Sequence, residues 1–180
     1  MKIIKTFIKD LLVVEPQLFN DDRGFFYESY NKKNLDKIIK IAFVQDNESK
    51  SNKGVVRGLH FQLPPFEQTK LVRCVSGKIL DVAVDLRINS KTYGKFFSVE
   101  LSSENNNQLF VPKGFAHGFQ VLSETAIVNY KVDNFYNPKY DSGIIWNDKD
   151  LSIDWNIDLK PIISSKDLKL KSFKNLKSPF

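Results

Sequence analysis

The stretch KILDVAVDLR, residues 78–87, decides the fold class, because its apolar residues fall at every second position. Its alternation separates the side chains into two sets, with Leu80, Val82, Val84 and Leu86 on one side and Asp81, Ala83 and Asp85 on the other. A period of two residues is typical of an extended chain and not of a helix. We therefore predict a β-strand here.

Similar apolar runs recur around this stretch, separated by clusters of Gly, Pro, Asn and Ser. They predict strands within residues 70–77, 78–87, 94–102, 107–114, 117–123 and 126–136. Residues 30–41 form the best helix candidate, with Leu35, Ile38 and Ile39 on one side. We expect residues 1–180 to form one mainly β domain, a jelly-roll β-sandwich or barrel with a few short helices, and a peripheral tail from about residue 170.

The composition fits one domain with its own core. The chain has 180 residues, 42% of them apolar, and 15 are Phe. A single Cys excludes an intrachain disulfide and favours a reducing compartment. Lys5, Lys9 and Asp10 interrupt the N-terminal apolar residues, and no run approaches the ~20 residues of a membrane span. We expect a cytoplasmic protein without a membrane partner.

The net charge of +6 is concentrated in the tail. Residues 160–180 carry six of the 27 basic residues and only one of the 21 acidic ones, so the rest of the chain is almost balanced. A nucleic-acid-binding domain usually carries its positive charge on the folded body. The distribution therefore argues against nucleic acid as a partner, and we interpret the tail as a solvated segment.

An imidazole lies inside a predicted strand in GVVRGLHFQ, residues 54–62. A period of two places His60 and Gln62 on one inward face, and Lys70 on the inward face of the next strand. Polar side chains inside an apolar barrel are costly unless they are paired or used. Arg57 has the opposite parity, so it can act with His60 only if the strand is irregular. Gly58 is the expected position of a bulge or strand end.

The second histidine, His117, follows a turn in FVPKGFAHGFQ, residues 110–120. Its spacing P-x-G-x-x-H resembles the second motif of the cupin superfamily. One interpretation is a metal site of His60, His117 and Glu67, but the first cupin motif lacks its second histidine and Lys70 would repel a cation. Another is that both histidines are satisfied core residues.

The favoured interpretation is an organic acid/base site. Tyr130 shares a strand face with Ala126, Val128 and Val132, and could supply an acid opposite a His60 base. A carboxylate would orient that base, and both Asp167 and Asp85 are candidates. Candidate hydrogen-bond donors to phosphate oxygens are Arg23, Arg57, Lys70 and Lys166. Phe26 and Tyr136 are candidate aromatics for stacking on a planar base.

Six ordered motifs together resemble the dTDP-4-dehydrorhamnose 3,5-epimerase family. They are RGFFYES (23–29), FVQDNESKSNKGVVRGLHFQ (43–62), QTKLVRCVSGKILDVAVDLR (68–87), VPKGFAHGFQVLSETA (111–126), YKVDNFYNPKYDSGIIWND (130–148) and DLSIDW (150–155). The resemblance runs from about residue 10 to about residue 170. It implies a cupin-like homodimer without metal or cofactor that inverts C3 and C5 of dTDP-4-dehydro-6-deoxy-D-glucose, for L-rhamnose synthesis.

The resemblance also implies roles for individual residues. His60 would be the base, Tyr130 the acid, Asp167 the partner of the base, and Lys70 the cation beside the reacting centre. Substrate contacts would fall on Arg23, Phe26, Glu28, Gln45, Asp46, Asn47, Arg57, Gln62, His117, Tyr136, Asp141 and Lys166. The segment from Arg23 to Glu28 would reach the neighbouring subunit's site. Asp141 stands where the family commonly has Glu.

Three alternatives stay open at this point besides the metal-dependent cupin. The chain could invert only C3 or C5, or act on another nucleoside diphosphate 4-keto sugar. It could also bind a sugar nucleotide without catalysis, although such a protein would not need His60, Tyr130 and Asp167.

Overall fold

The computed structural model describes residues 1–156 and 161–180. The predicted strand at 78–87 is β8 (Lys78–Asp85), which lies between β11 (Phe115–Val121) and β9 (Phe96–Ser102). Strands β6 (Val56–Gln62) and β13 (Asp141–Gly143) complete a five-stranded antiparallel sheet in the order β13-β6-β11-β8-β9.

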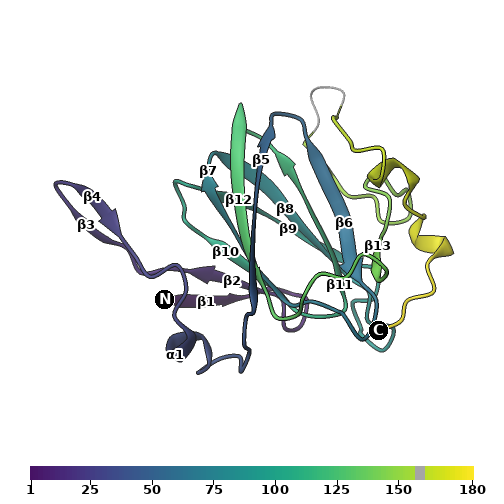
Figure 1. Ribbon diagram of the computed structural model, residues 1–180, viewed down its shortest axis with the longest axis horizontal. Coiled ribbons are helices and arrows are strands. Elements are labelled where there is room, and N and C mark those ends of the chain that lie inside the picture. Colours follow the sequence, from purple (N-terminus) through teal and green to yellow (C-terminus); the bar gives the residue numbers. More distant parts are fainter. Residues whose placement is uncertain (157–160) are drawn as a thin grey trace.

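A second antiparallel sheet has six strands in the order β1-β2-β10-β7-β12-β5. They are β1 (Lys2–Lys5), β2 (Leu12–Glu15), β10 (Gln108–Val111), β7 (Lys70–Ser76), β12 (Thr125–Val132) and β5 (Gln45–Asn52). The two sheets face one another (Figure 1), and the main core cluster joins residues of both, such as Val72 and Val128 with Ile79 and Ala83. The predicted mainly β, jelly-roll sandwich is confirmed.

Both faces of β8 are buried, which the alternation alone did not reveal. Ile79 and Ala83 face the other sheet, on the same side as Asp81. Val82 and Val84 lie in a second cluster on the outer face of the five-stranded sheet. That sheet is therefore covered on two sides.

The C-terminal segment, expected to be peripheral beyond about residue 170, covers this outer face (Figure 1). It contains two short 3₁₀ helices, η1 (Asp167–Lys169) and η2 (Phe173–Asn175). Phe180 stacks edge-on against Phe61 with ring centroids 5.7 Å apart. Apolar side chains pack on the sheet, while most of the lysines between them point to solvent.

The predicted helix at residues 30–41 is wrong in length. Only one turn forms, α1 (Lys32–Leu35), and Asn31 caps it by accepting from the Asn34 amide. Leu35 is buried, but Ile38 is largely exposed. A helix of a single turn has little intrinsic stability.

A hairpin of β3 (Phe19–Asp21) and β4 (Gly24–Phe26) projects away from the sandwich (Figure 1). Its phenylalanines are exposed, Phe26 at 68%. Among the described residues, no helix is long and apolar enough to cross a membrane.

Candidate active site

One cavity of about 280 Å³ opens between the two sheets and collects most of the predicted site residues. His60 and His117 come from the five-stranded sheet, and Lys70 and Tyr130 from the six-stranded sheet. The lining residues are Glu48, Ser49, Arg57, His60, Phe61, Gln62, Gln68, Lys70, His117, Gly118, Phe119, Tyr130, Tyr136, Asp141 and Lys166.

The predicted irregularity at Gly58 is confirmed. His60 pairs with His117 across β6 and β11, and Arg57 pairs with Phe119, so β6 has one residue more than β11 between these pairs. Gly58 has φ +119°, and an added Cβ would lie 2.6 Å from the Gly118 Cα. The bulge brings both Arg57 and His60 to the cavity.

His60 pairs with Asp167, one of the two carboxylates considered from the sequence. His60 Nε2 lies 2.7 Å from Asp167 Oδ1, and the Gly58 amide donates to Asp167 Oδ2 at 3.1 Å. Burial acts to raise the pKa of Asp167, but these hydrogen bonds outweigh it, so the pKa is lowered and the carboxylate stays charged. The alternative, Asp85, instead accepts from Arg87, Ser90 and Thr92.

His117 forms a second histidine–carboxylate pair, deeper in the protein. Its Nε2 lies 2.8 Å from Asp81 Oδ1, and both side chains are buried. Desolvation lowers the pKa of His117, which favours a neutral ring that donates to Asp81. Sequence reasoning did not include Asp81 in the site. The available signal was a carboxylate at an inward position of β8, next to an inward histidine on the neighbouring strand.

Lys70 and Tyr130 lie close to each other in the cavity. Lys70 Nζ is 6.0 Å from the centre of the Tyr130 ring. Desolvation lowers the pKa of Lys70 to about 8, although the charges of Asp81 and Asp141 act in the opposite direction. Desolvation also raises the pKa of Tyr130, so its phenol keeps its proton at neutral pH.

A polar cluster of Tyr136, Asp141 and Lys166 lies at the exposed rim. The Tyr136 hydroxyl donates to Asp141 Oδ2 at 3.0 Å, and Lys166 Nζ bonds the same oxygen. The hydrogen bond to Asp141 raises the pKa of Lys166, which therefore remains a cation. Asp141 is one methylene shorter than the Glu that is common at this position, and it still contacts both Tyr136 and Lys166.

Strand β5 brings only some of its predicted residues toward the cavity. Gln45 accepts from the Tyr136 amide at 3.3 Å and donates to Asn47 at 2.8 Å, so both lie beside the rim. Asp46 has the opposite parity, is exposed and accepts from Lys131 at 2.8 Å, away from the rim residues that Gln45 contacts. The structure therefore does not support a substrate contact by Asp46 within this chain.

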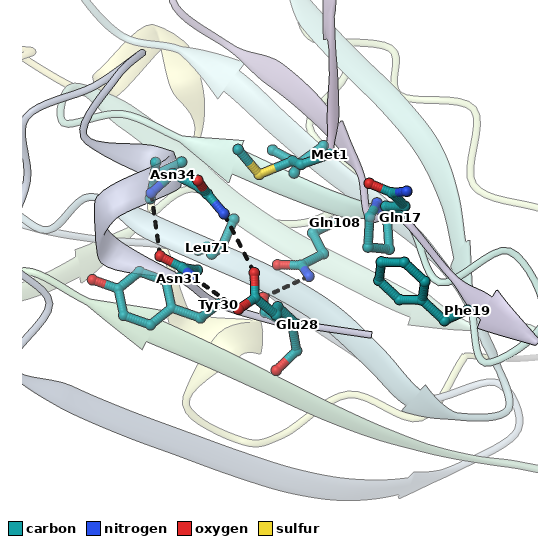
Figure 2. Close-up of a pocket in the computed structure, with 13 residues that line it drawn as sticks. Met1, Gln17, Phe19, Glu28, Tyr30, Asn31, Asn34, Leu71 and Gln108 are labelled. Atoms are coloured by element: carbon teal, nitrogen blue, oxygen red, sulfur yellow. Dashed lines mark hydrogen bonds between the residues drawn. The ribbon is translucent and has the colours of Figure 1, made fainter. Parts of the chain in front are cut away.

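The hairpin residues also lie outside this cavity. Arg23 is at the hairpin tip, where it pairs with Asp21 at 2.6 Å, and Phe26 is exposed. Glu28 lines a separate pocket of about 100 Å³, where it accepts from Asn31 and Asn34 at 2.8 and 3.3 Å (Figure 2). One chain alone therefore does not bring Arg23, Phe26 or Glu28 to His60.

The metal alternative gains no support from the side chains. Within the described ranges, no three His, Cys, Asp or Glu residues are grouped so that they could hold a metal ion. Glu67 does not line the cavity, and each histidine is already paired with one aspartate.

Comparison with known proteins decides the family. Residues 5–175 match the family model described as dTDP-4-dehydrorhamnose 3,5-epimerase. The chain belongs to this epimerase family. A relative from Shigella flexneri with that name is 52% identical over 175 residues, which cover 96% of each chain.

Solved structures of other epimerases agree over the same length. The dTDP-4-dehydrorhamnose 3,5-epimerase of Elizabethkingia anophelis NUHP1 has a TM-score of 0.93 and 52% identity, covering 99% of this chain and 98% of that one. The dTDP-6-deoxy-D-glucose-3,5-epimerase of Legionella pneumophila, in complex with dTDP-4-keto-L-rhamnose, has a TM-score of 0.94 and 44% identity, covering 97% and 94%.

Proposed function

We propose that this epimerase inverts C3 and C5 of dTDP-4-dehydro-6-deoxy-D-glucose and releases dTDP-4-dehydro-L-rhamnose. The observation that carries the proposal is the His60–Asp167 pair, in which His60 lines one cavity with Lys70 and Tyr130, in a chain of this family. The sugar nucleotide bound to the Legionella relative supports the same ligand class here.

His60 acts as the base. The ketone at C4 acidifies the hydrogens on C3 and C5, because removal of either one leaves an enolate with its charge on O4. With Nε2–H donated to Asp167, the lone pair of His60 lies on Nδ1 and can accept the proton. The buried carboxylate of Asp167 then stabilises the imidazolium.

Lys70 stabilises the enolate oxygen. Its pKa of about 8 leaves most of the amine charged at neutral pH, inside a site where water screens little. A fixed donor of this kind contributes about 3 kcal/mol to transition-state binding, by analogy with a single oxyanion-hole donor.

Tyr130 returns a proton from the other side. It lies on the six-stranded sheet, whereas His60 lies on the five-stranded sheet. Two proton-transfer groups on opposite sides of a carbon are what inversion requires, because one group alone would only exchange the hydrogen. Both steps move protons without net oxidation, so the reaction needs no redox cofactor.

The nucleotide lies along the rim. Arg57 and Lys166 supply positive charge for the diphosphate, and Tyr136 offers an aromatic face to the base. Gln45, Asn47, His117 and Asp141 complete the contacts of one chain.

A second copy supplies Arg23, Phe26 and Glu28. The projecting hairpin exposes three phenylalanines, Phe19, Phe25 and Phe26, which association with another chain would cover. We place this homodimer in the cytoplasm, which is consistent with the single buried thiol of Cys74.

Proton NMR in heavy water tests the reaction. Deuterium entering at C3 and C5, with an L-configured product, is the expected result. Exchange at one carbon would indicate a mono-epimerase, and exchange with a different nucleotide sugar only would change the substrate. If no 4-keto sugar nucleotide exchanges, the chain is a binding protein. His60→Ala should abolish exchange at both carbons.

Mixing two inactive variants tests the dimer. In a mixed dimer of His60→Ala and Arg23→Glu, one site combines an intact His60 with an intact Arg23 from the other chain. Partial activity should therefore return on mixing. If the mixture stays as inactive as its components while mass measurement shows mixed dimers, the hairpin does not serve the neighbouring site.

A further inference from the structure

Gln62 lines the cavity, but its side-chain amide is already occupied by protein groups. It is the last residue of β6 and is only 3% exposed. Its Nε2 donates to the carbonyls of Phe66 and Phe135 at 2.7 and 3.2 Å, and its Oε1 accepts from the Asn137 amide at 2.7 Å. An amide has two N–H donors, and both are used, so none remains for a substrate oxygen.

Two of the three groups that Gln62 binds flank Tyr136, and the third is the carbonyl of Phe66. Phe135 precedes Tyr136 and Asn137 follows it, in the irregular segment between β12 and β13. A backbone without sheet partners must satisfy its polar groups in another way. Here side-chain amides satisfy them, since Gln45 accepts from the Tyr136 amide at 3.3 Å and Gln68 donates to the Asn134 carbonyl at 2.8 Å.

The Tyr136 side chain is half exposed, and its hydroxyl donates a hydrogen bond to Asp141 at the cavity rim. A tyrosine on an irregular, exposed segment would lose much of its orientation without hydrogen bonds that hold the backbone of that segment. Gln62 provides that support from the end of β6, one strand residue beyond Phe61 and two beyond His60. Hydrogen bonds from Gln62 thus attach the backbone on both sides of Tyr136 to β6, the strand that carries His60.

We propose that Gln62 is a positioning residue, which holds Tyr136 for the nucleotide and does not itself contact the substrate. This inference rests on the proposed function in so far as Tyr136 binds the nucleotide. The proposal differs from the expectation from the sequence, which counted Gln62 among the substrate contacts.

Gln62→Met tests the inference, because methionine keeps the length of the side chain and removes all three hydrogen bonds. Gln120→Met is the matched control. Gln120 is an equally buried glutamine on the neighbouring strand β11, and it donates to the Asn156 carbonyl at 2.8 Å, outside the cavity lining.

Hydrogen–deuterium exchange gives a readout that does not depend on activity. Gln62→Met should speed exchange of a peptide spanning residues 133–138 by tenfold or more, and Gln120→Met should leave that peptide unchanged. Unchanged exchange in Gln62→Met, or an equal increase in both variants, would overturn the inference. This result stands even if the wild-type chain turns over no sugar nucleotide, which would refute only the proposed function.

Kinetics then separate positioning from contact. Gln62→Met should raise KM about tenfold and change kcat by less than threefold. In a Tyr136→Ala background the same substitution should have no further effect on KM, because the residue through which it acts is gone. A large loss of kcat, or a full effect that persists without Tyr136, would mean that Gln62 meets the substrate directly.

Discussion

Replacing Asp167 by Asn isolates the contribution of one charge to the base. The substitution keeps the size of the side chain and leaves an oxygen that the Gly58 amide can still reach. It removes the negative charge 2.7 Å from His60 Nε2 and places an N–H donor there in one of its two orientations. Both changes act against an imidazolium, and the second also favours the wrong tautomer of His60.

The size of the effect follows from the burial of the pair. Asp167 is 3% exposed, and breaking a buried charged pair costs about 3–5 kcal/mol. The imidazolium exists only after proton abstraction, so this cost falls on the transition state and not on substrate binding. At about 1.4 kcal/mol for each factor of ten, kcat should fall on the order of 10³-fold with little change in KM.

The assay is the rate of deuterium incorporation at C3 and C5, measured by proton NMR. Asp85→Asn is the control, because Asp85 is an equally buried carboxylate whose partners are Arg87, Ser90 and Thr92. It should lower the melting temperature while kcat stays near that of the wild type. If Asp167→Asn folds and retains more than about a tenth of kcat, less than 1.4 kcal/mol depends on its charge and the reasoning is wrong.

Three further outcomes are expected. Lys70→Met should lower kcat about 10²-fold. The wild-type kcat should also fall as pH rises through about 8, where Lys70 loses its charge. If kcat of Lys70→Arg falls over the same pH range as that of the wild type, the fall does not come from Lys70. Tyr130→Phe should keep deuterium exchange but form almost no inverted product, whereas normal product formation would remove Tyr130 from the mechanism. Burial acts to raise the pKa of Asp85, but its hydrogen bonds outweigh burial, so the pKa is lower in the folded than in the unfolded chain. The charged carboxylate therefore stabilises the fold fully above about pH 4, and this stabilisation is lost as pH falls through the folded pKa. The free energy of unfolding in urea should accordingly depend less on pH in this range for Asp85→Asn than for the wild type.

The strands predicted from the sequence could be found because each of them carries its own evidence, whereas β5 has an entirely polar sequence and was not predicted. Alternation in residues 78–87 and apolar runs between turn residues are local signals, and the strands formed where they lie. The helix at 30–41 was overestimated because Leu35, Ile38 and Ile39 suit a helix face, but tertiary contacts bury only Leu35 fully. The packing of the C-terminal segment on β8 is a long-range contact, for which a pattern along one strand contains no information.

The site was predictable to the extent that sheet parity fixes direction. Parity placed His60, Lys70 and Tyr130 inward, and all three line the cavity. It could not choose between Asp85 and Asp167, because that choice depends on where a distant segment crosses the sheet. Parity also predicted that Gln62 points inward as a ligand would, but two of the three partners of its amide, Phe135 and Asn137, lie more than 70 residues away along the chain.

The irregularity at Gly58 joins these elements into one site. In a regular strand Arg57 and His60 would face opposite sides, and the extra residue of β6 turns both to the cavity. The same bulge leaves the Gly58 amide free to donate to Asp167 Oδ2, which holds the carboxylate whose other oxygen meets His60. An added Cβ on Gly118 would lie 2.5 Å from the Arg57 carbonyl, so glycine is required on both strands. One backbone irregularity thus positions three groups of the proposed site together: Arg57 as the cation for the diphosphate, His60 as the base, and Asp167 as its partner.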